Sequence, residues 1–329
     1  MKRLPYGMAL IAAPVLCIIL SLFFGRYTMD FGEVMGALFT PAQMPSQTAH
    51  VVWQLRLPRA LAAAFCGSAL AVSGAAFQGV FRNPLVNSGV LGVSNGAGFG
   101  ACLAIVFLGG GLSTYVLAFV FAVGAVLLSY FAGRISKMTT SMSLVLGGVI
   151  VSSFFNALIS IMKYMADPYT QLPSITFWFM GSFASINYTH FYAFIPMALG
   201  IAVIFLLRWR INVLSMGDKE AFALGVDVRL CKMLIIGGAT LCTAAAVCIS
   251  GTIGWVGLVI PHIGRMLVGN DNHRLIPLSI SLGACFLVLI DLLSRILSSS
   301  ELPIGILCAL VGTPFFVYLL KKTKGGGWQ

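Results

Sequence analysis

The chain has 329 residues, of which 59% are hydrophobic and only 9% charged, with a mean hydropathy of +0.98. This composition excludes a soluble globular domain and is typical of a protein that crosses a membrane several times. The net charge of +11 would suggest nucleic-acid binding in a soluble protein, but in a membrane protein it follows from topology.

Ten apolar segments can be placed as membrane-spanning helices, each of which needs about 20 residues. In chain order they are residues 6–25, 57–80, 89–108, 113–133, 140–164, 189–208, 229–250, 253–268, 275–296 and 302–320. Lys2 and Arg3 precede the first segment as in a signal peptide, but no small-residue cleavage site follows before Arg26, so we expect a retained helix. The sequence therefore predicts an all-α polytopic membrane protein with one transmembrane domain over residues 1–329.

The basic residues predict the orientation, because they remain on the cytoplasmic side during insertion. With the N-terminus inside, all but five of the 20 Lys and Arg residues fall on cytoplasmic connections. The exceptions are Arg26, Arg56, Arg59, Lys163 and Arg295. An even number of helices then places both termini in the cytoplasm.

Small residues recur at every fourth position in the second and third segments. They are Gly67, Ala71, Ala75 and Gly79, and then Gly92, Gly96 and Gly100. This spacing lets helix backbones approach closely in lipid, so it predicts helix packing and no chemistry. Between the two segments, Pro84 predicts a turn.

The residues that bind metals or nucleotides elsewhere show no such pattern in this chain. The eight cysteines lack C-x-x-C spacing, so we expect them to be free thiols. His262 has no second ligand at metal-binding spacing, so we expect a structural hydrogen bond and no metal site. The phosphate loop G-x-x-x-x-G-K-[ST] is absent, so this chain needs no cofactor and any ATP chemistry belongs to another chain.

Several motifs together resemble one known family. They are Arg56 to Arg59 (RLPR), Ser73-Gly74, Gln78-Gly79, Arg82 to Leu85 (RNPL), Leu91 to Val93 (LGV), Gly254 to His262 (GWVGLVIPH), Glu301 to Gly305 (ELPIG) and Gly312 to Phe315 (GTPF). In order and spacing they resemble the FecCD-type permeases, the membrane subunits of ABC importers for ferric siderophores, haem and cobalamin. The chain departs from the family pattern at residues 86–88, where Val-Asn-Ser replaces a small residue, an acid and a proline.

The resemblance implies the type II ABC importer permease fold and an assembly in the bacterial cytoplasmic (inner) membrane. The expected partners are a second copy of this chain or a sister permease, two cytoplasmic ABC ATPase subunits that carry ATP and Mg, and an extracytoplasmic substrate-binding protein. Ferric siderophore is the first cargo expected, with haem and cobalamin as alternatives.

Eight of the 29 charged residues lie between Arg208 and Lys232, so this stretch must face water. The resemblance implies that residues 209–228 couple the permease to its ATPase. The expected coupling residues are Asp218, Glu220, Ala221, Phe222, Leu224, Gly225 and Asp227. A short helix there would bury Phe222 and Leu224 in a cleft of the ATPase. The alternative is an ordinary solvated loop.

The outer arginines are the expected docking residues for the binding protein. The resemblance implies that Arg56, Arg59 and Arg295 pair with acidic residues of that protein. These pairs would align the bound protein over the pathway. Alternatively, Arg56 and Arg59 anchor their helix at the lipid headgroups, and Arg295 pairs with Asp291 one turn earlier.

The segment at 140–164 carries polar residues on one face. Ser152, Asn156 and Ser160 recur at every fourth position, and the resemblance implies that this helix lines the pathway, whereas interhelical hydrogen bonding is the alternative. The resemblance also places cytoplasmic gate positions at Asn83, Leu85, Met142 and Ser143.

Two other classes of function remain as rivals. An ion-coupled secondary transporter needs ionisable groups near the bilayer midplane, and Asp291, the nearest acid, lies one turn from the outer end with Arg295 beside it. An intramembrane enzyme would need a nucleophile and base pair or a metal motif such as H-E-x-x-H, and neither is present.

Overall fold

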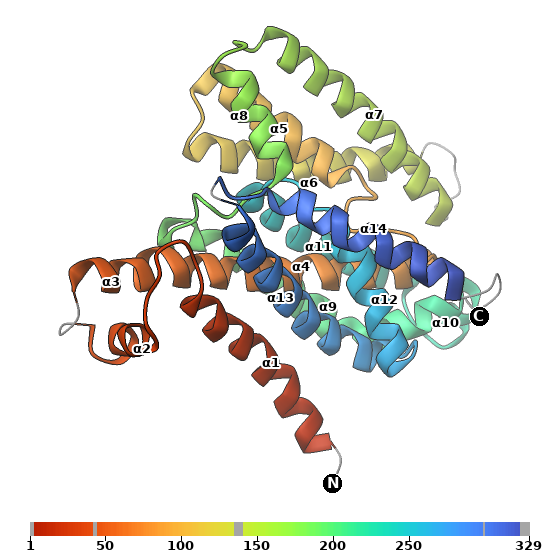
Figure 1. Ribbon diagram of the computed structural model, residues 1–329. Helices are drawn as coiled ribbons and strands as arrows, with labels where there is room; N and C mark the ends of the chain where they lie inside the picture. The colour runs from red at the N-terminus through yellow and green to blue at the C-terminus, as the bar shows by residue number, and fades with distance from the viewer. Residues whose placement is uncertain (1–2, 42–44, 135–140, 299, 323–329) are drawn as a thin grey trace.

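The computed structural model describes residues 3–41, 45–134, 141–298 and 300–322, and these residues are predominantly α-helical (Figure 1). Each of the ten predicted segments contains a long helix. These helices are α1 (Arg3–Phe23), α4 (Leu57–Phe81), α5 (Val93–Leu108), α6 (Leu112–Arg134), α7 (Ser141–Met165), α9 (Phe194–Met216), α11 (Val228–Ser250), α12 (Val256–Val268), α13 (Asn272–Leu297) and α14 (Ile304–Lys322). By length and composition, six helical stretches of the described chain could cross a membrane, and four others are shorter and apolar.

Short helices connect the long ones, and of these the sequence predicted only the helix of the coupling segment, α10. They are α2 (Phe31–Phe39), α3 (Ser46–His50), the π-helix η2 (Val51–Arg56), α8 (Gln171–Met180), the 3-10 helix η3 (Tyr188–Ala193) and α10 (Asp218–Ala223). In Figure 1, α2, α3 and α8 lie toward the left and α10 toward the right. Following the predicted topology, we call the end with α2, α3 and α8 the outer end and the end with α10 the inner end. Lys2 and residues 323–329 lie outside the described residues, so the predicted placement of the termini stays a prediction.

Two predicted boundaries differ from the structure. Helix α5, in the third predicted segment, begins later than predicted, at Val93. The preceding residue, Gly92, has a φ of +78°, which lies outside the helical region. Conversely, α9 continues to Met216, eight residues beyond the predicted end. The helix continues past Arg208 and Arg210, so the connection between α9 and α11, residues 217–227, is shorter than the predicted 209–228.

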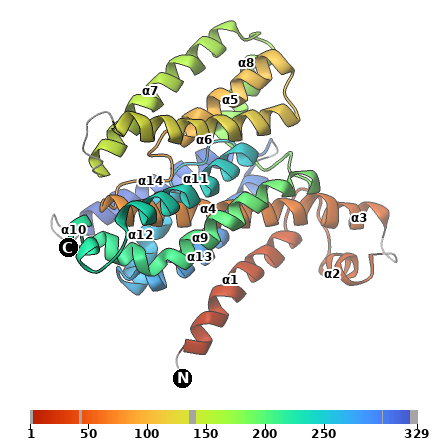
Figure 2. The same cartoon turned by 180° about the vertical axis from the view of Figure 1, so that it is seen from behind.

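Helix α4 lies at the centre of the bundle (Figures 1 and 2) and is buried along nearly its whole length. A side chain at Gly67 would collide with the Gly283 carbonyl of α13, and one at Gly74 would collide with Gly257 of α12. A side chain at Gly79 would collide with the Ile211 side chain of α9. The prediction that small residues on this helix permit close packing is therefore confirmed at Gly67 and Gly79.

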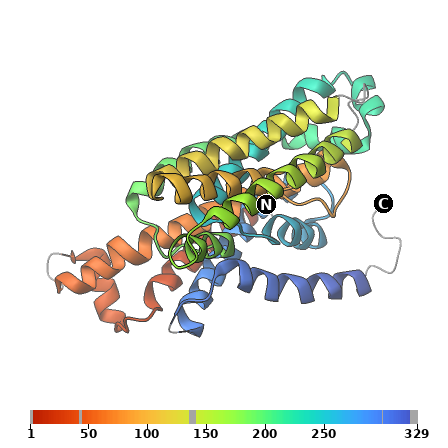
Figure 3. The ribbon, with the colours of Figure 1, turned by 90° about the horizontal axis from the view of Figure 1, so that it is seen from above.

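The third predicted segment packs in the same way. On α5, any side chain at Gly96 would meet the Phe121 carbonyl of α6, and any side chain at Gly100 would meet the Leu117 carbonyl. Helices α5, α6, α7 and α8 form one side of the molecule, whereas α14 runs along another side, as Figure 3 shows. The remaining long helices pack around α4.

We expect Gly67→Ala to lower the free energy of unfolding by about 1–3 kcal/mol, because the added methyl group forces α4 away from the Gly283 carbonyl. The matched control is Gly124→Ala on α6, where the methyl group would meet no atom within 4 Å. Thermal unfolding of the purified proteins in detergent measures both. Equal melting temperatures for the two variants would contradict the packing account.

Candidate functional site

The inner end presents a short segment between two glycines. Gly217, with a φ of +146°, separates α9 from α10, and Gly225, with a φ of +77°, follows α10. Asp227 then caps α11, since its carboxylate accepts a hydrogen bond from the Leu230 amide at 2.9 Å. The predicted coupling segment is therefore a helix held between two backbone positions that favour glycine.

The apolar side chains of this segment point in opposite directions. Ala221 is fully buried, while Phe222 is 78% exposed and Leu224 is 61% exposed. The segment is fixed to α11 by an ion pair of 2.6 Å between Asp218 and Lys232, and Glu220 and Asp227 are exposed at its rim. A large exposed phenyl group with polar neighbours on a short, anchored helix is suited to insertion into a cleft of another protein.

The predicted gate turn follows α4. Arg82 adopts the left-handed conformation (φ +51°) and ends the helix, and the Asn83 side chain accepts a hydrogen bond from the Leu85 amide at 2.9 Å. Asn83 is exposed, and the Leu85 side chain is 55% exposed. The turn therefore presents a small amide and an apolar group at the inner surface.

A buried glutamine connects this turn to α12, and the sequence analysis assigned no role to it. The Gln78 amide donates to the Val86 carbonyl at 3.1 Å and to the Gly257 carbonyl at 3.3 Å, and it accepts a hydrogen bond from the Arg265 guanidinium at 2.6 Å. A glutamine in an otherwise apolar helix is the signal that points to such a site, because its amide must find partners inside the bundle.

The other predicted gate and pathway residues lie on α7. Met142, at its first turn, is 70% exposed, and Ser143 is half-buried. The predicted polar face divides in two: the Ser152 carbonyl accepts a hydrogen bond from Asn95 at 3.2 Å, whereas Asn156 and Ser160 are exposed. This hydrogen bond uses the backbone of Ser152 and not its hydroxyl group, so the pathway role and the interhelical alternative both stay predictions for the three side chains.

The three predicted docking arginines are buried at the outer end, with exposed fractions of 5%, 7% and 6% for Arg56, Arg59 and Arg295. Arg59 pairs with Asp291 at 2.8 Å and with Glu301 at 2.9 Å. Arg295 pairs with Asp291 at 3.3 Å, which confirms the expected local partner. The pairing of Arg59 with two acids was not foreseen. We call these five residues the arginine cluster.

Arg56 completes the arginine cluster without an acid. Its guanidinium donates to the carbonyls of Leu22 at 2.6 Å and Tyr27 at 2.5 Å, where the chain leaves α1. The cluster holds three guanidinium groups and two carboxylates, and Nη2 of Arg59 has no hydrogen-bond partner among the described residues. The cluster is therefore cationic and incompletely paired. A docking role for its arginines stays a prediction.

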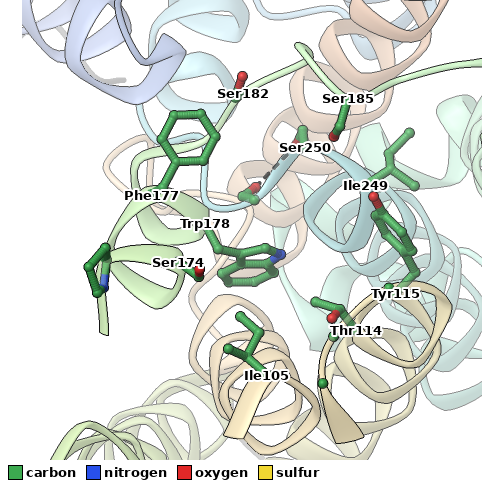
Figure 4. Close-up of a pocket in the computed structure, with 15 residues that line it drawn as sticks. Ile105, Thr114, Tyr115, Ser174, Phe177, Trp178, Ser182, Ser185, Ile249 and Ser250 are labelled. Atoms are coloured by element: carbon green, nitrogen blue, oxygen red, sulfur yellow. Dashed lines mark hydrogen bonds between the residues drawn. The ribbon is translucent and has the colours of Figure 1, made fainter. Parts of the chain in front are cut away.

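A cavity of about 590 Å³ lies at the outer end between α5, α6, α8 and α11. Figure 4 shows the aromatic side chains of Tyr115, Phe177 and Trp178 around it, together with the hydroxyl groups of Ser174 and Ser250. Its lining contains hydroxyl, aromatic and backbone groups and no charged side chain. Such a lining can make hydrogen bonds and stacking contacts but cannot neutralise a charged ligand.

Two carboxylates in the connecting segments have lowered pKa values. Hydrogen bonds from the Thr170 hydroxyl and backbone lower the pKa of Asp167, and the Asn212 amide lowers the pKa of Asp271. Both groups are therefore ionised at neutral pH. Asp271 caps α13 through the His273 amide at 2.9 Å, so protonation in acid would weaken that helix start.

The bundle of long apolar helices defines a multi-pass membrane protein. The comparisons with known proteins identify the class. The sequence matches the FecCD transport family over residues 13–322. The chain belongs to this family and is an ABC importer permease.

Two related permeases match most of the chain. The molybdate import system permease protein MolB of Haemophilus influenzae is 40% identical, over 99% of this chain and 97% of that protein. The vitamin B12 import system permease protein BtuC of Klebsiella pneumoniae is 34% identical over 84% of each chain. A solved structure of a metal-chelate type ABC transporter in an inward-facing conformation superimposes with a TM-score of 0.86, covering 97% of this chain and 99% of that one at 40% identity.

Asp291→Asn is expected to lower the free energy of unfolding by about 3 kcal/mol, because it leaves Arg59 and Arg295 buried with one carboxylate between them. Asp167→Asn is the matched control, since Asp167 is exposed and contacts only its own loop. Unfolding in detergent measures both changes. An unchanged stability of the Asp291 variant would show that the arginine cluster does not depend on its central acid.

Proposed function

We propose that this chain is the permease of a homodimeric importer in the bacterial cytoplasmic membrane, driven by two ATPase subunits and supplied by an extracytoplasmic binding protein. The observation that carries this proposal is the exposed Phe222 on the anchored helix α10, at the end predicted to face the cytoplasm. An apolar group held in water by an ion pair to α11 is suited to a protein partner.

The ATPase would act on the permease through this segment. Because α10 is joined to α9 through Gly217 and to α11 through residues 224–227, a movement of α10 would be carried into the bundle by these two helices. We assign the gate to Asn83 and Leu85 after α4 and to Met142 and Ser143 on α7. The exposed Asn156 and Ser160 would then line the pathway, together with Ser152.

The binding protein would dock over the arginine cluster. The cluster has a surplus of positive charge, and one Arg59 nitrogen has no partner within the described part of the chain, which suits acidic residues of the binding protein. Since the arginines already have partners within the chain, docking would require an exchange of Glu301 or Asp291 for an outside carboxylate. Glu301 is the more accessible of the two, with a side chain that is 25% exposed.

Ferric siderophore is the cargo we propose first, since the relatives include permeases named for iron chelatin and iron(3+)-hydroxamate import. Molybdate is the second candidate, because the molybdate permease is 40% identical over nearly the whole chain. An ion-coupled carrier is a weaker alternative, because Asp291 is already held by two arginines and is not free to bind a coupling ion.

Reconstitution tests the proposal. Liposomes that contain this chain, with the ATPase and binding protein encoded beside its gene, are supplied with a ferric siderophore, haem, cobalamin or molybdate. Uptake that needs ATP and both partners is the expected result, and the transported compound identifies the cargo. Uptake driven by an ion gradient without the ATPase would overturn the proposal.

We expect Gly225→Val to uncouple ATP hydrolysis from transport, because a β-branched residue is strained at a φ of +77° and would displace Phe222 and Leu224. Transport should fall at least tenfold while the protein still inserts. Gly225→Asn is the matched control, because asparagine tolerates this conformation and should retain most activity. Comparable transport by both variants would remove the coupling role of this turn.

Glu301→Gln is expected to strengthen docking of the binding protein about threefold to tenfold at low salt. The change frees Arg59 from one of its two internal acids, so an outside carboxylate meets less competition. Surface plasmon resonance on the reconstituted permease measures the affinity. Asp167→Gln is the control for loss of an outer acid away from the cluster. An affinity that is unchanged for Glu301→Gln would argue against docking through Arg59.

A further inference from the structure

A second hollow lies on the side of the bundle, away from the proposed pathway residues. Helix α1 diverges from the bundle toward its N-terminal end, as Figures 1 and 2 show. The resulting groove has a volume of about 710 Å³ and is lined from α1, α4, α9 and α13. Its lining is apolar apart from two serines, and one of these, Ser68, already donates to the Ile280 carbonyl at 2.9 Å.

The groove has the length of one lipid chain. Its α9 wall runs from Ala198 to Leu206, which at 1.5 Å per residue is about 12 Å. Half of the hydrocarbon core of a bilayer is about 15 Å. The groove is therefore nearly as long as one leaflet is thick.

A cationic group closes the inner end of the groove. Phe205 lines the groove, and the Arg208 guanidinium lies over its ring at 3.8 Å from the centroid. Arg208 also donates to the Phe205 carbonyl at 3.1 Å and lies 3.4 Å from His273 Nε2. Its Nε atom is buried and has no hydrogen-bond partner among the described residues. Arg208 is thus fixed in place with a donor still unused.

The surrounding charges favour an anion at this position. Arg274 is exposed at the first turn of α13, next to His273. The nearby acid, Asp271, is occupied by the Asn212 amide at 2.7 Å and by the His273 amide. Trp209, which follows Arg208, is 59% exposed, as is typical of a tryptophan at the level of the lipid headgroups.

We propose that this groove binds an anionic phospholipid of the leaflet at the inner end. One acyl chain lies between α1, α9 and α13, and the phosphate group accepts hydrogen bonds from Arg208, with Arg274 adding charge. The apolar length selects a lipid chain, and the cationic end selects an anionic headgroup over a zwitterionic one. The site would hold α1 against the bundle without closing the gap between them.

Native mass spectrometry of the delipidated full-length protein tests this site. Titration with dioleoyl-phosphatidylglycerol should show one tightly bound lipid per chain, with an affinity at least fivefold higher than for dioleoyl-phosphatidylcholine. Arg208→Gln should remove most of this difference. Arg134→Gln is the matched control, because Arg134 also lies over an aromatic ring, that of Tyr130, near the inner end of α6.

A second pair of variants tests the acyl-chain groove. Ala202→Trp should fill it and abolish the tight site for both lipids, whereas Leu199→Trp, on α9 but outside the lining, should not. If Arg208→Gln fails to fold, the exposed Arg274→Gln serves in its place and should weaken phosphatidylglycerol binding. Equal affinities for the two lipids, or an effect of Arg208→Gln no larger than that of Arg134→Gln, would overturn the proposal. The proposal would also be overturned if the mass spectra showed a bound protein in the groove in place of lipid, and if Ala202→Trp removed that protein.

Discussion

Backbone contact along α4 is the constraint on which the arrangement of this bundle depends. Within lipid, apolar side chains gain little by leaving one apolar surface for another, so helices associate through close packing. Gly67, Gly74 and Gly79 bring α4 against α13, α12 and α9, respectively. One helix therefore positions three neighbours. A larger side chain on α4 at any of these glycines would displace the neighbour that it meets.

The two ends of α4 carry polar groups, and this relates the outer surface to the inner one. At the outer end Arg59 joins Asp291 and Glu301, and at the inner end Gln78 joins the turn after α4 to Arg265 on α12. Between these points, α4 is packed closely against the backbones of α13 and α12. One helix thereby joins the arginine cluster at the outer end to the predicted gate turn at the inner end.

Local patterns in the sequence predicted the features that depend on near neighbours. The apolar segments predicted the ten long helices, and small residues at every fourth position indicated the packing faces. The four-residue spacing of Asp291 and Arg295 predicted their pairing. The contacts that were missed join distant segments: Arg59 and Glu301 are 242 residues apart, and Gln78 and Arg265 are 187 apart. No periodicity within one helix carries that information. The short helix α2 was missed because its capping box, Asp30 with Glu33, lies in a segment of only nine helical residues.

The separation of Arg59 from Asp291 has a consequence for how the chain is made. Arg59 enters the membrane early in synthesis, and its carboxylate partner follows 232 residues later on α13. Until then the guanidinium has to remain at the headgroup level, because an unpaired charge is costly in hydrocarbon. Arg59 therefore becomes buried and paired only after α13 has been inserted, and a chain that stops before α13 leaves the arginine cluster unformed.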